Sequence, residues 1–267
     1  MGNKVIMILV DALNYKIGSS AMGIMKHLTD SNLAIGYRIK TELPTLSRPL
    51  YETILTGTPC SVNGIFNNQI VRRSHEKSVF DLARENSLTT AAAAYHWVSE
   101  LYNKAPFNPL EDRDQEDENA NIQYGRFYFD DAYPDSHLFL DGEQLRKKHD
   151  PDFLFIHPMG VDYVGHAHGC DSREYRGKII EIDNILGSLV PLWIELGYYV
   201  IITADHGMDF LGLHNGIEED ERTVPLWIVK KNINKELFKN EYSQLEIAPL
   251  ICKLLEINKS EKMLNID

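Results

Sequence analysis

The sequence predicts one α/β domain in which a mostly parallel central sheet carries helices on both faces. Short apolar runs rich in branched residues recur along the chain, as strands buried on both sides of a parallel sheet require. Segments with helical periodicity lie between several of these runs, and this alternation is typical of parallel strands joined by covering helices. With 267 residues, 43% of them hydrophobic, the chain is long enough to bury one large core.

Five strands and five helices are expected in order along the chain. The first apolar run, residues 5–10, predicts a strand that ends at Asp11. The other strands are expected at residues 89–95, 153–157, 198–203 and 224–229. Helices are expected at residues 17–29, 49–55, 78–85, 173–196 and 244–255. The fourth helix is long and amphipathic, with one apolar stripe formed by Ile179, Ile182, Ile185, Leu186 and Leu189.

Neither periodicity holds between residues 103 and 133, and residues 111–119 are almost entirely polar and acidic. Long segments of this kind in compact domains are usually functional or mobile, whereas an acidic run by itself is usually a solvated loop. We therefore expect a small inserted lid over the sheet edge. The domain is expected to span residues 1–267, with the insertion at about 103–133.

Composition excludes one class of partner. The 39 acidic and 27 basic side chains give a net charge of −12, which would repel a nucleic acid polymer. Three widely spaced cysteines favour neither a disulfide framework nor a cysteine zinc cluster. The apolar run at residues 5–10 is too short for a signal sequence or a membrane span. These features predict a cytoplasmic protein without a membrane span.

Metal-ligand side chains occur in four separate segments, each of which we expect at the end of a strand. They are Asp11, Asp162, His166, Asp205, His206 and His214. The carboxyl ends of parallel strands meet at one edge of an open sheet, so these side chains are expected to converge. Three carboxylates and three imidazoles suit two divalent ions. Two such ions can stabilise the attacking and leaving oxygens of a phosphoryl displacement.

Ser47 is the candidate nucleophile. It lies just ahead of Pro49, a residue that suits the first turn of a helix. Backbone N–H groups and the positive end of the helix dipole would then point at the group that Ser47 attacks, which favours a phosphoryl group. Metal coordination can lower the pKa of a serine hydroxyl enough to supply the alkoxide. A purely capping role for Ser47 would explain the same position.

Residues 43–57 resemble the nucleophile motif of type I phosphodiesterases, the nucleotide pyrophosphatase/phosphodiesterase branch of the alkaline phosphatase superfamily. That motif has the pattern Pro-Thr-x-Thr-x-Pro, then a helix ending in Thr-Gly, and then His-Gly-Ile and an asparagine. Ser47 stands at the position of the nucleophilic threonine, and the other matches are Thr56, Gly57, Gly64, Ile65 and Asn68. The resemblance covers most of the chain from Asp11 to His214 and implies an alkaline phosphatase-like fold.

The resemblance also implies roles for single residues. One zinc ion would be held by Asp11, Ser47, Asp205 and His206, and a second by Asp162, His166 and His214. Manganese is the alternative metal, because such ligands accept either ion. Asn68 would help to hold a nonbridging phosphate oxygen, with Asn67 as the alternative. His157 is expected to pack in the protein or to support a ligand, and His168 to be solvated or to support a ligand, rather than to bind a metal.

The sequence departs from the motif at three positions. Ser47 replaces the usual threonine and Asn63 stands where a histidine often precedes the glycine, and both changes leave the chemistry unchanged. Arg48 stands where an aromatic residue is common. It would either form a local salt bridge or bind substrate with a second positive charge, and the second role would favour a dianionic monoester.

We therefore expect a two-metal phosphoric ester hydrolase, a phosphodiesterase or nucleotide pyrophosphatase, that forms a covalent intermediate on Ser47. Its substrate would be a small phosphorylated molecule such as a nucleotide. A phosphomonoesterase or phosphonate hydrolase would use the same ligands, and a phosphomutase is a further alternative. Outside enzymes, the alternative is a metal-dependent domain that binds a phosphorylated ligand without cleaving it.

Overall fold

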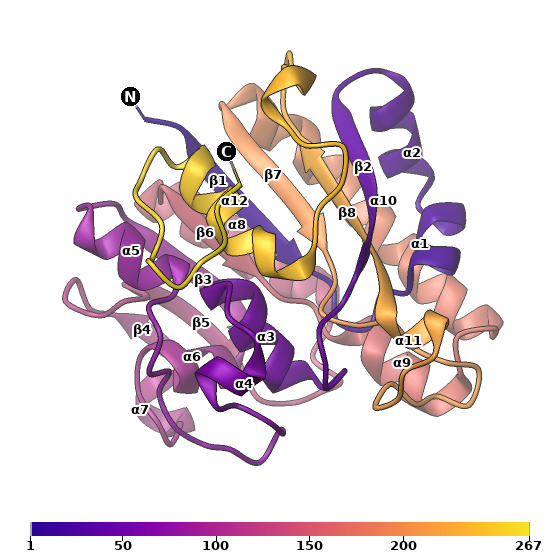
Figure 1. Cartoon of the computed structure of the whole chain (residues 1–267), viewed down its shortest axis with the longest axis horizontal. Helices are drawn as coiled ribbons and strands as arrows, with labels where there is room; N and C mark the ends of the chain where they lie inside the picture. Colours follow the sequence, from indigo (N-terminus) through magenta and orange to yellow (C-terminus); the bar gives the residue numbers. More distant parts are fainter. Residues whose placement is uncertain (1, 267) are drawn as a thin grey trace.

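One eight-stranded sheet organises the computed structural model, which describes residues 2–266 (Figure 1). The strand order is β2-β8-β7-β1-β6-β3-β5-β4. The five strands from β7 to β5 in this order run parallel, whereas β8, β2 and β4 each pair antiparallel with a neighbour. The strands are β1 (Lys4–Leu9), β2 (Ala34–Lys40), β3 (Thr90–Tyr95), β4 (Asp114–Glu116), β5 (Tyr124–Tyr128), β6 (Phe153–Ile156), β7 (Tyr198–Thr203) and β8 (Thr223–Val229).

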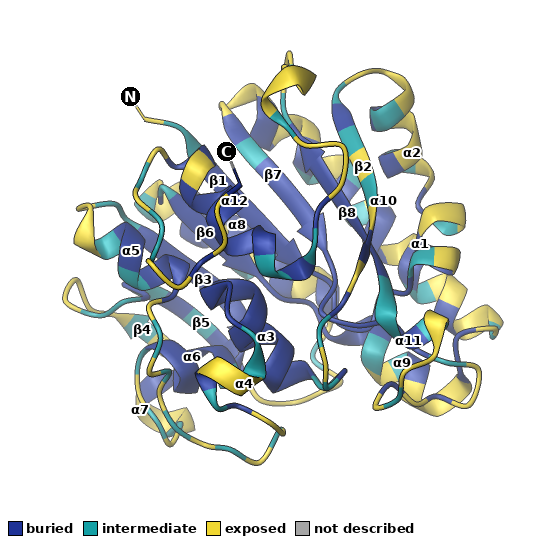
Figure 2. Ribbon diagram, in the orientation of Figure 1, coloured by how far each residue is buried: buried dark blue, intermediate teal, exposed yellow. Residues whose placement is uncertain are grey.

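Strand β1 shows why the centre of the sheet is parallel. Five of its six residues are buried, and it pairs with β6 on one side and β7 on the other. A strand covered on both faces needs apolar side chains at successive positions, and the sequence KVIMIL supplies them everywhere except at Lys4, its first residue. The predicted fold class is confirmed. Figure 2 shows the central strands in the dark blue of buried residues, whereas peripheral helices such as α1 and α2 carry exposed residues.

Helices cover both faces of the sheet. One face carries α10, which contacts α1, α2, α8, α9 and β7, and the other carries α12, which contacts α3, α5 and β1 (Figure 1). The helices are α1 (Tyr15–Ala21), α2 (Gly23–Asp30), α3 (Ser47–Thr56), α4 (Cys60–Asn63), α5 (Val79–Glu85), α6 (His96–Tyr102), α7 (Pro109–Asp112), α8 (Asp135–His149), α9 (Gly160–His168), α10 (Arg173–Glu195), α11 (Glu219–Arg222) and α12 (Ile247–Leu254), with 3-10 turns η1 (Lys235–Leu237) and η2 (Gln244–Glu246).

The helix expected at residues 17–29 is two helices, α1 and α2, separated at Met22. The carboxylate of Asp183 on α10 accepts hydrogen bonds from the backbone amides of Ile24, at 2.8 Å, and Met25, at 3.4 Å. A new helix can start there because a buried acceptor from another element satisfies its first N–H groups. The break therefore depends on a residue far away in the sequence.

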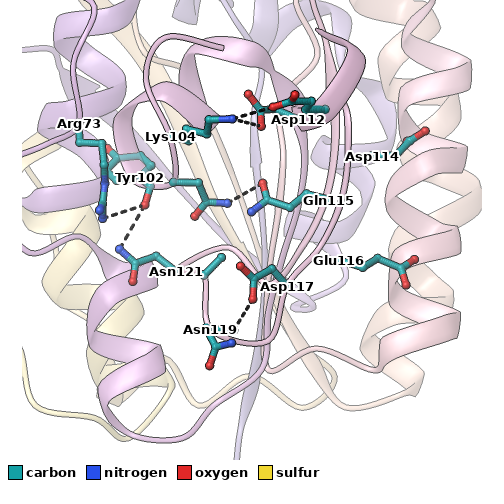
Figure 3. Close-up of a pocket in the computed structure, with 13 residues that line it drawn as sticks. Arg73, Tyr102, Lys104, Asp112, Asp114, Gln115, Glu116, Asp117, Asn119 and Asn121 are labelled. Atoms are coloured by element: carbon teal, nitrogen blue, oxygen red, sulfur yellow. Dashed lines mark hydrogen bonds and ion pairs between the residues drawn. The ribbon is translucent and has the colours of Figure 1, made fainter. Parts of the chain in front are cut away.

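The segment expected as an insertion, residues 103–133, contains α7, β4 and β5 and lies at the sheet edge. A cleft of about 530 Å³ opens here (Figure 3). Its lysine is paired locally, since the Nζ of Lys104 lies 3.1 Å from a carboxylate oxygen of Glu111 and 3.3 Å from one of Asp112. None of the proposed metal ligands lines this cleft. Among the described residues, no helix combines the length and apolarity needed to cross a bilayer.

Candidate active site

The neighbouring strands β1 and β7 bring two carboxylates together. Asp11 and Asp205 each lie two residues beyond the end of a strand, and Leu9 is paired with Thr203 in the register. The Oδ1 of Asp205 accepts a hydrogen bond of 3.2 Å from the backbone amide of Ala12. The parallel register therefore fixes both carboxylates at the carboxyl edge of the sheet, as the sequence predicts.

A short helix supplies the third carboxylate and one imidazole. Strand β6 ends at Ile156, and Asp162 and His166 lie on α9 rather than at the strand end itself. Residues four apart share a helix face. Accordingly, the Oδ1 of Asp162 lies 3.4 Å from the Nε2 of His166. The aspartate and histidine of this segment thus reach the site as an adjacent pair.

The three imidazoles are oriented by backbone carbonyl groups. The Nδ1 atoms of His166, His206 and His214 lie within 2.8, 2.9 and 2.8 Å of the carbonyl oxygens of Gly212, Gly207 and Thr45, respectively. A carbonyl oxygen can only accept, so each Nδ1 carries the proton and each Nε2 is left as a lone-pair donor. The Nε2 atoms of His166 and His214 lie 3.2 Å apart.

Two groups of three atoms that could each hold a metal ion, here together called the ligand cluster, share His206. One consists of Asp11, Asp205 and His206, and the other of Asp162, His206 and His214. Within the described chain, one carboxylate oxygen of each aspartate is buried without a hydrogen-bond partner: Oδ1 of Asp11, Oδ1 of Asp162 and Oδ2 of Asp205. Unpaired buried carboxylate oxygens are strongly unfavourable unless a cation neutralises them. The donor set therefore fits two divalent ions.

Electrostatics favour the metal-binding protonation states of the imidazoles. Burial and the charge of His214 lower the pKa of His206 to about 3, and burial lowers the pKa of His214. Both rings are therefore neutral at pH 7, which is the form that coordinates metals. Burial and the negative charge of Asp11 raise the pKa values of Asp162 and Asp205. Divalent ions would reverse this shift by stabilising the carboxylates.

Ser47 lies at the first position of α3, beside the imidazole of His206. Its Oγ is 3.1 Å from the Nε2 of His206, and the residue is 6% exposed. The capping position belongs to Leu46, and no side chain caps the helix. The Ser47 hydroxyl therefore faces the ligand cluster and does not cap the helix.

The amide side chain of Asn68 is bonded to the start of the same helix. Its Oδ1 accepts a hydrogen bond of 3.1 Å from the backbone amide of Arg48. The Oδ1 of Asn67 instead accepts from the amide of Gln69, at 2.9 Å, in a local turn on the surface. Of the two asparagines, Asn68 is the one that contacts the nucleophile helix.

The guanidinium of Arg48 forms the local salt bridge. Its Nη2 lies 2.7 Å from an oxygen of Glu100, its Nη1 donates to the carbonyl of Ile70 at 3.0 Å, and its Cζ lies 4.6 Å from the ring centre of Trp97. Arg48 is 1% exposed. The positive charge of Arg48, for which the sequence also allowed a contact with substrate, is therefore paired inside the protein.

Tyr51, which the sequence did not single out, supports the Asp11 carboxylate. The hydroxyl of Tyr51 donates to the Oδ2 of Asp11, and the Nε2 of His157 lies 3.1 Å from the same oxygen. Burial alone would raise the pKa of Asp11, but these contacts and the nearby imidazole of His206 lower it to about 2. Tyr51 is four residues after Ser47, so helical spacing from the candidate nucleophile is the signal that could have identified it.

Solved structures share this fold. Murine ectonucleotide pyrophosphatase/phosphodiesterase 5 superposes with a TM-score of 0.72 at 12% identity, and the alignment covers 97% of this chain and 96% of that one. Identity this low supports the fold alone. The match agrees with the parallel sheet and with the helices on its two faces.

Curated relatives carry a more specific name. The chain is 23% identical over 239 residues to GPI ethanolamine phosphate transferase 2 of Kluyveromyces lactis, covering 87% of this chain and 29% of that protein. It is 22% identical over 245 residues to the catalytic subunit of the human transferase 2, covering 88% and 24%. The chain thus spans about a quarter to a third of the length of these relatives.

The prediction of a cytoplasmic protein is wrong in view of these relatives, which are named as GPI ethanolamine phosphate transferases. Residues 5–10, on which the prediction relied, form most of the buried strand β1. They carry information about the sheet and none about location.

The model of one family, "Type I phosphodiesterase / nucleotide pyrophosphatase", matches residues 5–225. The match includes the whole ligand cluster and Ser47. Members of the superfamily typically depend on two metals, in agreement with the two ligand groups around His206. The chain therefore belongs to the type I phosphodiesterase / nucleotide pyrophosphatase family of the alkaline phosphatase superfamily.

Proposed function

We propose that this chain cleaves phosphodiesters with two bound metal ions and transfers the phosphoryl group through a covalent intermediate on Ser47. The observation that carries the proposal is the position of the Ser47 Oγ, 3.1 Å from the Nε2 of His206, at the start of α3. One metal would be held by Asp11, Ser47, Asp205 and His206, and the other by Asp162, His166 and His214. Zinc is the proposed metal, because imidazole and carboxylate ligands suit it, and manganese is the alternative.

The bound ions would lower the pKa of the Ser47 hydroxyl and offset the charge that develops on the phosphoryl oxygens. Ser47 Oγ forms a bond to phosphorus while the bond from phosphorus to the leaving oxygen breaks. The serine proton passes to solvent, and the leaving oxygen takes a proton from water. A second hydroxyl group, from water or an alcohol, then attacks phosphorus, loses its proton and releases Ser47.

Residues of this chain position the reacting groups. The N-terminal end of α3 directs its dipole at the phosphoryl group. We propose that Asn68 keeps this end in place through its bond to the Arg48 amide and uses its NH2 group for a nonbridging oxygen. Tyr51 and His157 fix the orientation of Asp11.

Charge favours a diester over a monoester. A monoester is a dianion at neutral pH, whereas a diester carries one negative charge. Arg48, the basic residue next to Ser47, is neutralised by Glu100. Its guanidinium is therefore not free to match the second negative charge of a monoester.

The relatives suggest the transferred group. They are named as ethanolamine phosphate transferases, so we propose that the covalent intermediate carries ethanolamine phosphate and that an alcohol takes it up. Water would replace the alcohol in a hydrolysis. A nucleotide pyrophosphatase would use the same Ser47 step with a different leaving group.

The test compares kcat/KM of metal-loaded protein for bis(4-nitrophenyl) phosphate, 4-nitrophenyl phosphate and the 4-nitrophenyl ester of ethanolamine phosphate. We expect both diesters to be preferred over the monoester and both activities to be lost in Ser47→Ala. Thymidine monophosphate 4-nitrophenyl ester serves as the nucleotide comparison. Preference for the monoester, or full activity of Ser47→Ala, would contradict the proposal.

A further inference from the structure

A buried glutamine near the C-terminal end of the chain, Gln244, joins a metal-ligand residue to the segment that leads into Ser47. Gln244 is 0% exposed. Its Oε1 accepts a hydrogen bond of 2.7 Å from the backbone amide of Glu42, and its Nε2 donates one of 2.6 Å to the backbone carbonyl of Asp205. Residues 42–46 are here called the nucleophile segment. One side chain therefore connects this segment to the loop that follows β7.

The two backbone groups depend on Gln244. In the part of the chain that the structure describes, neither the Glu42 amide nor the Asp205 carbonyl has another hydrogen-bond partner. Asp205 is fully buried, so water does not replace the missing partner. A buried polar group that loses its hydrogen bond is strongly unfavourable. The two bonds of Gln244 therefore hold both groups at one distance from each other.

The turn that carries Gln244 is itself fixed next to the nucleophile helix. A capping box formed by Ser243 and Glu246 encloses η2, and the Ser243 amide donates to the Glu246 carboxylate at 2.7 Å. η2 also contacts α3, and Figure 1 shows the yellow C-terminal segment beside that helix. A Cβ on Gly57, the residue that ends α3, would lie 3.2 Å from the carbonyl oxygen of Leu245. The turn and the helix therefore pack in close contact.

Thr45 forms a second link at the other end of the nucleophile segment. Its hydroxyl donates to the carbonyl of Gly216 at 2.9 Å, and its carbonyl lies 2.8 Å from the Nδ1 of His214. The segment is thus bonded to Asp205 through Gln244 and to His214 through Thr45. These two ligand residues belong to different groups of the ligand cluster. Ser47 is therefore placed by links to both groups.

We propose that Gln244 is a positioning residue, which holds the nucleophile segment against Asp205 and thereby sets the position of the Ser47 Oγ relative to the bound metal ions. The inference rests on the proposed function, in which Ser47 attacks phosphorus. A displacement of about 1 Å between reacting groups can lower a rate by about 100-fold. Gln244 lies outside residues 5–225, the part of the chain that matches the family model, so the match assigns it no role.

Gln123 offers a matched control. It is 6% exposed, its Oε1 accepts from the backbone amide of Thr90 at 3.0 Å, and its Nε2 donates to the backbone carbonyl of Glu118 at 3.2 Å. Thr90 is the first residue of β3, so this second bridge lies at the amino ends of the parallel strands, away from Ser47. Gln244→Met and Gln123→Met therefore remove equivalent bonds near the site and far from it.

The test measures kcat and KM for bis(4-nitrophenyl) phosphate with metal-loaded protein, and metal affinity by chelator competition. We expect Gln244→Met to lower kcat by about 10- to 100-fold, with a smaller change in KM, because the position of Ser47 matters in the transition state. Metal binding should weaken by about tenfold, because Asp205 loses a supporting bond. Gln123→Met should leave all three quantities unchanged, although the urea midpoint should fall by a similar amount in both variants.

Gln244→Ala provides a second variant in case Gln244→Met does not fold. It leaves space in which water can bond to both backbone groups without fixing the distance between them. The same fall in kcat is expected, with Gln123→Ala as its control.

Two outcomes would overturn the inference: unchanged kcat in the Gln244 variants, or an equal loss of kcat in the Gln244 and Gln123 variants. Failure of the proposed function is a different result. It would appear as diester turnover that Ser47→Ala leaves intact, whatever the Gln244 variants show.

Discussion

Arg48 and Glu100 form a buried ion pair whose removal should affect stability far more than substrate preference. Their side chains are 1% and 6% exposed, and the Nη2 of Arg48 lies 2.7 Å from the Oε2 of Glu100. Arg48→Met keeps most of the volume but leaves a buried carboxylate whose remaining bond is the one from the Phe107 amide, at 3.0 Å. Removing one partner of such a pair costs about 3–5 kcal/mol, and losing the bond to Ile70 adds about 1 kcal/mol.

Urea denaturation followed by circular dichroism measures this effect. Arg48→Met should lower the free energy of unfolding by about 4–6 kcal/mol, and Glu100→Gln should lower it by about 3–5 kcal/mol. The double variant should recover at least about 2 kcal/mol relative to the sum of the two, because neither charge is then left alone. The ratio of diester to monoester kcat/KM should not change in Arg48→Met.

A different pattern would refute this reasoning. If Arg48→Met were nearly as stable as the unmodified protein and raised KM for the monoester by about tenfold or more, the guanidinium would have to act on substrate. The charge argument for a diester would then fail as well.

Three further predictions concern the nucleophile helix and the ligands. Tyr51→Phe should weaken metal binding by about 10- to 100-fold in chelator competition, because Asp11 loses an orienting hydrogen bond; unchanged affinity would contradict this. Burial raises the pKa of Glu52 from 4.5 to about 7. The folded state therefore binds a proton that the unfolded state releases, and the free energy of unfolding should fall by on the order of 1–3 kcal/mol as pH rises from about 4.5 to about 7. The variant Glu52→Gln should lack this pH dependence. An equal pH dependence in both proteins would exclude Glu52 as its source. Removal of metal with a chelator should lower Tm, because bound ions neutralise three buried carboxylates. Zinc at about 1,000 times its Kd should then raise the free energy of unfolding by about 4 kcal/mol. A Tm that does not depend on metal would count against the two-metal site.

The central strands were predictable because burial on both faces leaves a local signature. Strand β1 is apolar at nearly every position, and so is β7. Strand β2 has no such signature, since its burial alternates only in part along AIGYRIK and its stability comes from antiparallel pairing with β8. Edge strands of this kind depend on a partner that is distant in the sequence, so a local pattern does not reveal them.

The site shows the same division. Metal-ligand residue types can be recognised one segment at a time, and the structure brings the segments together. Asp11 and Asp205 follow strands, as predicted, whereas Asp162 lies on α9. The environment of Arg48 could not be read in this way, because it depends on Glu100 on α6 and on the carbonyl of Ile70. Either role of Arg48 was compatible with the sequence, and only the fold places a carboxylate beside its guanidinium.

The mass of the peptide containing Ser47, measured after acid quenching of the reaction with the 4-nitrophenyl ester of ethanolamine phosphate, tests the central claim most directly. Nitrophenolate leaves readily, so formation of the intermediate should outpace its breakdown and the adduct should accumulate. We predict an added ethanolamine phosphate group on Ser47 and none in Ser47→Ala. A burst of nitrophenolate with Ser47 unmodified, or with the group on another residue, would contradict the account.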